Sequence, residues 1–340
     1  MPFVSSCGSQ KRRILGVEEG AVDPCQVLHI SLNPDGSITR HDDNWPKTPA
    51  TPDPPIDIPV LSKDVFINQS TNVWVRIFLP RQALLDHNKL PLIVYFHGGG
   101  FIICSADMTA FHNFCLNMAV QVQAVVLSVK YRLAPEHRLP TAYDDAIEVL
   151  HWIKTTTEEW LTKYVDFSNC FLMGNSAGGN LAYHAGLRAA AEVGNLQPLK
   201  IRGLILHHPF FGGTNKTDSE LRLADKNPLY HRSVVELAWN LCLPIGAEAD
   251  LDHEYCNPAV EGGSKVVLDQ IKRLGWKVMM SGCYGDPVID RLIELVKIME
   301  EKGVQVVSHF VEGGSHSMEI GDASKAMVLY SQIKDFIFSS

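Results

Sequence analysis

A single serine, Ser176, lies between small residues where a hydrophobic run ends, in the stretch CFLMGNSAGGNLAYH over residues 170–184. The apolar residues before it predict a buried strand, and the helical spacing after it predicts a helix. Gly-x-Ser-x-Gly between a strand and a helix is typical of a tight turn that presents a serine Oγ and needs small residues at Gly174 and Gly178. Ser176 is therefore the candidate nucleophile, and the amide of Ala177 would point toward an oxyanion formed beside it.

A second stretch, YFHGGGF over residues 95–101, places three glycines directly after another apolar run. Consecutive glycines allow several backbone N–H groups to approach one atom, as an oxyanion hole requires. We predict that the amides of Gly98 and Gly99 act as donors together with that of Ala177. We interpret His97 as a structural support rather than a proton carrier.

A serine hydroxyl at neutral pH needs a general base, and the base needs an orienting carboxylate. In sheets of this kind the three residues follow one another as Ser, Asp or Glu, and His, each after a later strand. Asp286 in SGCYGDPVIDR and His316 in FVEGGSHSME both follow apolar runs. Asp290 is an alternative acid, and Asp286 could instead cap the next helix. His309, the other histidine after the acid, lies inside an apolar run.

Apolar, β-branched runs alternate with longer stretches of helical spacing along most of the chain. This alternation predicts a mostly parallel sheet with helices on both faces, in which ligands bind at the carboxyl ends of the strands. The expected strands are 73–79, 90–96, 124–131, 169–174, 203–208, 276–282 and 304–311, and the expected helices are 140–155, 177–193, 287–302 and 322–338.

Two regions depart from this alternation. Residues 1–60 are irregular, and the proline-rich stretch 44–59 excludes a helix or a central strand. We expect an N-terminal segment that crosses the surface, either as a lid or as a tail. In the remaining domain, 61–340, the interval from about 212 to 260 contains SVVELAWNLCL at helical spacing and no strand, which predicts an inserted helical cap.

Aromatic residues near these strand ends and in the expected cap are candidates for the walls of a substrate pocket. We predict Phe101, Phe211 and Trp239 as substrate-binding residues. Phe210 is an alternative to Phe211, and packing in the core is the alternative for the aromatic residues in general.

Composition and charge exclude other classes of function. The chain has 340 residues, 46% hydrophobic and 20% charged, with a net charge of −8 and a pI near 5.9. With scattered basic residues, this predicts no nucleic acid and no membrane surface as partner. The eight cysteines show no zinc-ligand spacing, so we expect reduced thiols and no metal. Without a signal-like h-region or a stretch of membrane-spanning length, we expect a cytoplasmic protein.

The motifs HGGGF, YRLAPEHRLPTAYDD, GNSAGGN, GDPVID and GGSH, in this order, resemble the plant carboxylesterases of the hormone-sensitive-lipase-like branch of α/β hydrolases. The similarity runs from about residue 28 to the C-terminus. It implies an α/β-hydrolase fold with an eight-stranded sheet, a cap partly made by the N-terminal segment, YRLAPEH as a support for the active-site loops, and no metal or organic cofactor. Asn175, where relatives usually carry an acid, and Ser315, where they carry a bulkier residue, depart from the pattern and bear on the substrate.

Together these features predict a serine carboxylesterase that cuts a short-acyl or methyl ester of a small plant metabolite, acting as a monomer or weak homodimer. One alternative is a methyl-ester hydrolase coupled to decarboxylation, or a lyase-like enzyme, in indole-alkaloid metabolism, because relatives include 2-hydroxyisoflavanone dehydratases. The other is a hormone receptor, because gibberellin receptors resemble this family. Those receptors have lost the triad histidine, which is present here as His316.

Overall fold

The protein is described by a computed structural model covering residues 22–41, 45–85, 89–260 and 265–339. Its centre is an eight-stranded sheet with the order β10-β9-β8-β7-β5-β6-β4-β3. Neighbours from β10 to β6 are parallel, whereas β4 and β3 join antiparallel at one edge. The strands are β3 Val60–Asn68, β4 Val73–Pro80, β5 Leu90–Phe96, β6 Val125–Lys130, β7 Val165–Asn175, β8 Ile201–His207, β9 Lys277–Cys283 and β10 Gln305–Val311.

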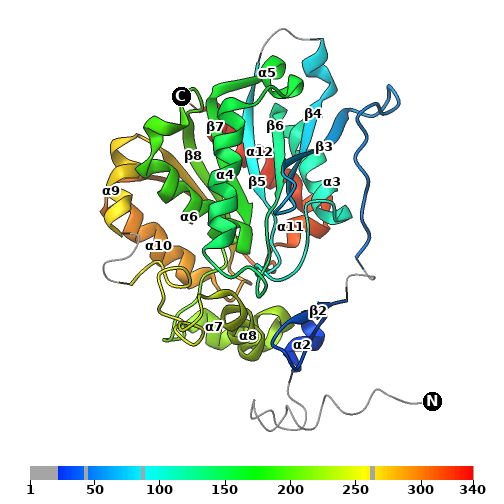
Figure 1. Ribbon diagram of the computed structural model, residues 1–340. Helices are drawn as coiled ribbons and strands as arrows, with labels where there is room; N and C mark the ends of the chain where they lie inside the picture. Colours follow the sequence, from blue (N-terminus) through cyan, green and yellow to red (C-terminus); the bar gives the residue numbers. More distant parts are fainter. Residues whose placement is uncertain (1–21, 42–44, 86–88, 261–264, 340) are drawn as a thin grey trace, which may run out of the picture.

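Helices cover both faces of this sheet (Figure 1). Alternate residues of β5 enter different cores, Val94 on one face and Ile93 on the other, because successive strand side chains point to opposite sides. One face carries α4 (Thr141–Thr155), α6 (Ala177–Ala191), α9 (Lys265–Arg273) and α10 (Ile289–Glu301), and the other carries α3 (Thr109–Met118) and α12 (Ala323–Phe338).

Shorter helices connect these elements. The connecting segments are α5 Glu159–Tyr164 and α11 Met318–Gly321, the 3₁₀ turns Arg81–Leu84, Val193–Leu196, Ala224–Lys226 and Pro228–Tyr230, and the π-helical turn Ala119–Gln123.

None of the helices in the described ranges combines the length and apolar character needed to cross a bilayer.

Every strand and helix expected from the alternating pattern is present within a few residues of its predicted ends, which confirms the mostly parallel sheet. Strand β3 was not predicted, because polar residues interrupt its sequence, VLSKDVFIN, and it lies at the sheet edge with an alternating exposed face. The expectation of irregular structure before residue 60 is wrong for one hairpin, β1 (Ile30–Leu32) with β2 (Ile38–Arg40). The part of the predicted lid before residue 22 lies outside the described residues.

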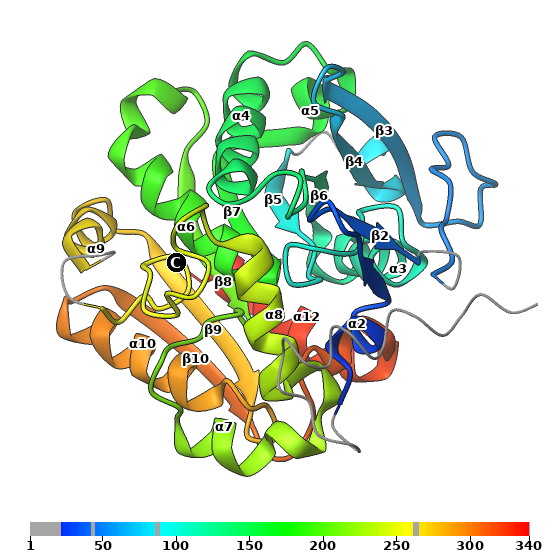
Figure 2. The same cartoon turned by 60° about the horizontal axis from the view of Figure 1, so that its bottom comes forward.

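The N-terminal segment and the inserted interval meet at one end of the sheet. Helix α2 (Pro24–Val27), in the N-terminal segment, contacts α8 (Arg232–Cys242), in the inserted interval. The inserted interval, of which all residues from 212 to 260 are described, also holds α7 (Asp218–Leu223) and contains no strand. Figure 1 shows α2, β2, α7 and α8 together at this end, and Figure 2 views the molecule with that end forward.

Arg40, at the end of β2, fixes the hairpin to the loops that follow β5 and β6. Its guanidinium donates to both carboxylate oxygens of Glu136, at 2.8 and 2.7 Å, and to the carbonyls of Ile102 and Ala134, at 2.5 and 2.6 Å. A bidentate pair with two further carbonyl acceptors fixes orientation as well as distance. The motif YRLAPEH thus contributes Glu136 to the anchor of the N-terminal segment.

Candidate active site

Ser176 forms the turn between β7 and α6. Its backbone has φ 54° and ψ −123°, and a Cβ added at Gly178 would lie 2.0 Å from the carbonyl oxygen of Phe96. The turn therefore admits no side chain at Gly178, as the Gly-x-Ser-x-Gly pattern predicted. The amide of Ser176 donates to the carbonyl of His207 at 3.0 Å, which fixes the turn to the neighbouring strand β8.

Asp286 and His316 lie at the ends of the next two strands and contact each other. The imidazole Nδ1 of His316 donates to Oδ2 of the buried Asp286 at 2.7 Å. The other carboxylate oxygen, Oδ1, accepts from the amide of Val288 at 3.2 Å. Val288 is itself the N-cap of α10, and this helix has no side-chain cap, so the alternative role of Asp286 as a helix cap is not observed. Asp290 instead accepts from the amide of Ser219 at 2.7 Å, away from His316.

Asp286 has a second imidazole neighbour, and this contact was not predicted from the sequence. Nδ1 of the buried His208 lies 2.5 Å from Oδ2, the same oxygen that accepts from His316. On its other side, Nε2 of His208 is 3.8 Å from Glu319, which accepts from Nε2 of the adjacent His207 at 3.1 Å. The available signal was a pair of histidines at the carboxyl end of β8, the strand beside the serine turn.

Two sets of three side chains could each offer a metal ligand atom within 4.8 Å of the others: His207, His208 and Glu319, and His208, Asp286 and His316. His207 already contacts Glu319 at hydrogen-bond distance, and His208 and His316 already contact Asp286, whereas Nε2 of His208 stays 3.8 Å from Glu319. These hydrogen bonds form a buried network in which the imidazoles stabilise the ionised carboxylates in place of water.

The acids of this network are held ionised by their histidine neighbours. Burial alone would raise the pKa of Asp286, but the charge of His316 and the hydrogen bonds from His208 and His316 outweigh it and hold this pKa well below its ordinary value. Burial also opposes ionisation of Glu319, yet the hydrogen bond and charge of His207 lower its pKa to about 2. Burial lowers the pKa of His207 to about 4, so it donates to Glu319 as a neutral imidazole at pH 7.

Tyr230, from the inserted interval, reaches the reacting end of His316. Its hydroxyl is 3.0 Å from Nε2, and the two rings are 4.5 Å apart. Burial and the charge of Asp286 raise the pKa of Tyr230 well above its ordinary value, while a hydrogen bond with Ser176 acts in the opposite direction. The hydroxyl therefore keeps its proton, and it lies close to both Ser176 and His316. No motif in the sequence singled out this residue.

The glycine-rich loop lies beside Ser176. Gly98 and Gly99 line one cavity together with Ser176 and His316. Gly99 has φ 113°, and a Cβ there would lie 2.2 Å from the carbonyl oxygen of Ile103, so only glycine fits. The amide of Ala177, at the first position of α6, has no acceptor within the helix and is available to a ligand.

His97 stabilises the glycine-rich loop. Its buried ring stacks on Tyr131 with centroids 4.4 Å apart, and the hydroxyl of Tyr131 donates to the His97 carbonyl at 2.8 Å. Burial lowers the pKa of His97 to about 4. It is therefore neutral at pH 7 and holds the loop through packing and hydrogen bonds.

The cavity that holds Ser176 has a volume of about 440 Å³ and walls that are mostly apolar. Asn175 lies at its edge, where it accepts from the hydroxyl of Tyr95 at 2.6 Å and donates to Ser317 at 3.3 Å, while Ser315 is exposed on the loop. The N-terminal segment contributes Val27, Leu28, His29 and Trp45 to the lining, and the inserted interval contributes Leu229, Tyr230, Val234, Val235 and Ala238.

The aromatic residues predicted to bind substrate lie outside the lining of this cavity. Phe101 and Trp239 are buried in the core behind the wall, and Phe211 faces a different cavity. Phe210, the alternative to Phe211, lines the cavity and stacks on Trp239 with centroids 4.7 Å apart. Phe210 therefore replaces Phe211 as the ring on the cavity wall, and Phe101 and Trp239 are not wall residues. The sequence gives no signal for which of two adjacent rings in the loop after β8 faces the cavity.

Comparison with known proteins identifies the family of this chain. A family model described as an α/β-hydrolase fold matches residues 93–320. Carboxylesterase 20 of Arabidopsis thaliana is 53% identical over 321 residues, covering 93% of this chain and 97% of the relative. The chain belongs to the plant carboxylesterase family of α/β hydrolases. It is a serine carboxylic ester hydrolase, and the hormone-receptor alternative is set aside.

Two further similarities extend this result. A 3-O-acetylpapaveroxine carboxylesterase of Papaver somniferum is 42% identical to this plant carboxylesterase over 331 residues, covering 93% of this chain and 98% of the relative. The solved esterase of Pyrobaculum calidifontis superposes with a TM-score of 0.67 at 24% identity, covering 82% of this chain and 84% of that chain. The second similarity shows the fold alone.

Proposed function

We propose that this carboxylesterase hydrolyses a short-acyl or methyl ester of a small plant metabolite, with Ser176 as nucleophile, His316 as general base and acid, and Asp286 as its orienting carboxylate. The observation that supports this most strongly is the placement of Ser176 and His316 on the wall of one cavity, with Asp286 buried directly behind His316. These three groups fill the roles that acyl transfer through a covalent intermediate requires.

The first half-reaction forms an acyl-enzyme. Nε2 of His316 removes the Ser176 proton as Oγ attacks the ester carbonyl, and ionised Asp286 stabilises the imidazolium through Nδ1. The amides of Gly98, Gly99 and Ala177 bind the oxyanion of the tetrahedral intermediate. His316 then gives the proton to the alcohol oxygen, and the alcohol leaves.

The second half-reaction repeats these steps with water. His316 removes a proton from water, the resulting hydroxide attacks the acyl carbon, and the collapse of the second tetrahedral intermediate returns the proton to Ser176. Ionised Asp286 is needed in both halves, and its depressed pKa supports that role across the neutral pH range.

The cavity supports a compact ester. The N-terminal segment and the inserted interval both contribute residues to its lining, which is consistent with a cap built from the N-terminal segment and from residues of about 212–260 that encloses the ligand. The names of the poppy relatives, which include an acetylated compound, favour an O-acetyl ester of a plant alkaloid as one candidate within this class. A net charge of −8 is compatible with a neutral or cationic alcohol.

Two serines line the cavity, Ser176 and Ser317, and they provide a matched pair of variants. Ser176→Ala is expected to reduce kcat for p-nitrophenyl esters by several orders of magnitude, because only binding and the oxyanion hole remain. Ser317→Ala should retain kcat within roughly tenfold. Retention of more than about a tenth of wild-type kcat in a folded Ser176→Ala protein would reject the assignment.

The same assay tests the substrate class. Across p-nitrophenyl esters from acetyl to palmitoyl, kcat/KM should be highest for acetyl to butyryl, because a cavity of about 440 Å³ must hold both parts of the ester. A maximum at dodecanoyl or longer would contradict the compact-ester proposal.

A further inference from the structure

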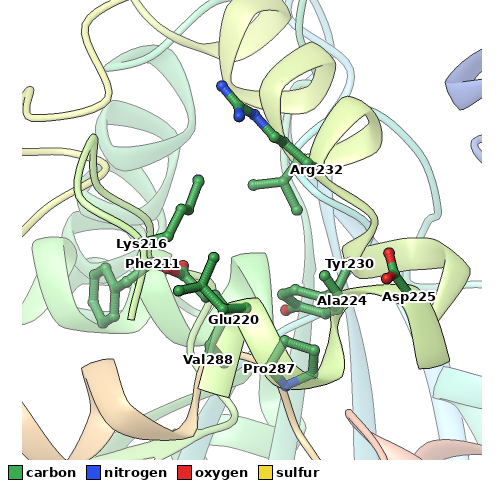
Figure 3. A pocket seen from close by; sticks show the side chains of 11 residues that line it. Phe211, Lys216, Glu220, Ala224, Asp225, Tyr230, Arg232, Pro287 and Val288 are labelled. Atoms are coloured by element: carbon green, nitrogen blue, oxygen red, sulfur yellow. The ribbon is translucent and has the colours of Figure 1, made fainter. Parts of the chain in front are cut away.

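A second cavity adjoins the catalytic one, and Tyr230 lies on the boundary between them. This cavity has a volume of about 190 Å³, and among the described residues only Tyr230 and Val235 line both spaces. Figure 3 shows its side chains, with Tyr230, Pro287 and Val288 along one side and Arg232 across the opening. The other residues around it are Phe211, Lys216, Glu220, Leu221, Ala224 and Asp225.

The ring of Tyr230 is held in this position by contacts with residues that line the catalytic cavity. The residue is 6% exposed, and its ring packs against Phe210 and His316 with centroids 6.1 and 4.5 Å away. Its hydroxyl, 3.0 Å from Nε2 of His316, ties the ring to the base. A buried aromatic ring with its polar end satisfied has little freedom to turn aside.

The position of the hydroxyl identifies which part of an ester lies beside the ring. His316 must deliver its Nε2 proton to the oxygen of the leaving alcohol, so that oxygen has to come within hydrogen-bond distance of Nε2. In the structure the atom at that distance is the Tyr230 hydroxyl. The alcohol part of the substrate therefore lies next to Tyr230, and the acyl part lies on the opposite side of the scissile bond.

We propose that Tyr230 is a specificity-determining residue that limits the size of the alcohol part of the ester by closing the second cavity to it. This inference rests on the proposed function, because the orientation of the ester follows from the role of His316. The residues that line the second cavity include the apolar Phe211, Ala224 and Val288, so the group it would accept once opened is an additional fused ring of an aromatic alcohol.

The test compares acetate esters of increasing alcohol size: phenyl, naphthyl and phenanthryl acetate. Tyr230→Ala should raise the ratio of kcat/KM for phenanthryl over phenyl acetate by about tenfold or more, a typical effect of pocket size on selectivity. Tyr230→Phe keeps the ring and should leave this ratio at the wild-type value. The acyl-length profile with p-nitrophenyl esters should be the same in all three proteins.

Refilling the second cavity is the control. Ala224 lines that cavity and not the catalytic one, so Ala224→Phe alone should leave the wild-type ratio unchanged. In the Tyr230→Ala background it should return the ratio toward wild type. If Tyr230→Ala does not fold, Val235→Ala opens the same boundary without touching the triad, and the ratio should rise in the same direction.

Three outcomes are distinguishable. Hydrolysis that survives Ser176→Ala would overturn the proposed function and this inference with it. Hydrolysis that depends on Ser176, with the same alcohol-size ratio in wild type, Tyr230→Ala and Val235→Ala, would overturn this inference alone. A ratio that rises in Tyr230→Ala but is not reversed by Ala224→Phe would also overturn it, since the gain would not come from the second cavity.

Discussion

The two sides of the catalytic cavity are built in different ways. On one side Ser176, Asp286 and His316 each follow a strand of the sheet, β7, β9 and β10 respectively. The carboxyl-terminal halves of β7 and β9 are buried, whereas β10 is the partly exposed edge strand, and the sheet fixes where the three loops begin. On the other side, Val27, Leu28, His29 and Trp45 of the N-terminal segment and residues 229–238 of the inserted interval reach the cavity from helices and loops outside the central sheet. We infer that the sheet fixes the chemistry and that the other side fixes the choice of substrate.

The largest expected effect lies on the sheet side. Asp286→Asn should reduce kcat by roughly 10⁴-fold, because an amide cannot stabilise the imidazolium of His316 and favours the wrong tautomer. Asp290→Asn, four residues along and bound to the amide of Ser219, should change kcat only a few-fold. Steady-state hydrolysis of p-nitrophenyl acetate measures both. The reverse order would move the acid to Asp290.

A smaller effect is expected when the N-terminal segment is loosened. Arg40→Ala removes the bonds to Glu136 and to two carbonyls, so KM should rise by roughly three- to tenfold with kcat nearly unchanged. Arg81→Ala is the matched control, because Arg81 also binds backbone carbonyls of the proline-rich stretch but lies away from the catalytic cavity. Equal KM values in both variants and wild type would show that the segment is a tail.

The smallest effect concerns stability rather than rate. The pKa of Glu319 falls from 4.5 to about 2 in the folded protein, so its ionised form stabilises the fold above pH 4.5, and this contribution is lost as pH falls toward 2. Its size is at most about 3 kcal/mol. Glu319→Gln should therefore lower Tm at pH 7, and the difference from wild type should shrink below pH 4.5. A Tm difference that is constant from pH 7 to pH 3 would contradict this linkage.

The same contrast explains what could be predicted from the sequence. Most strands of the central sheet were predictable because residues buried on both faces produce continuous apolar runs. The edge strand β10 was predictable from its β-branched residues instead. The elbow around Ser176 was predictable because its geometry admits only glycine at Gly178. With those strands placed, the residues at their carboxyl ends, Asp286 and His316, follow from topology.

The rest depends on tertiary contacts that leave no periodic signal. Tyr230 lies on a 3₁₀ turn whose sequence does not reveal which way the ring points. His208 contacts Asp286 across 78 residues of chain, and the pairing is visible only after β8 and β9 lie side by side. Phe210 and Phe211 are adjacent, and the path of the loop alone decides which of them faces the catalytic cavity.

The most direct test of the central claim is covalent labelling by a fluorophosphonate, which reacts only with a serine that an adjacent base activates. Intact-mass and peptide analysis should find one adduct, on Ser176, formed at the same rate as hydrolytic activity is lost. The adduct should be absent in Ser176→Ala and present in Ser317→Ala. Labelling of Ser317 or another serine, or full inactivation without an adduct on Ser176, would contradict the account.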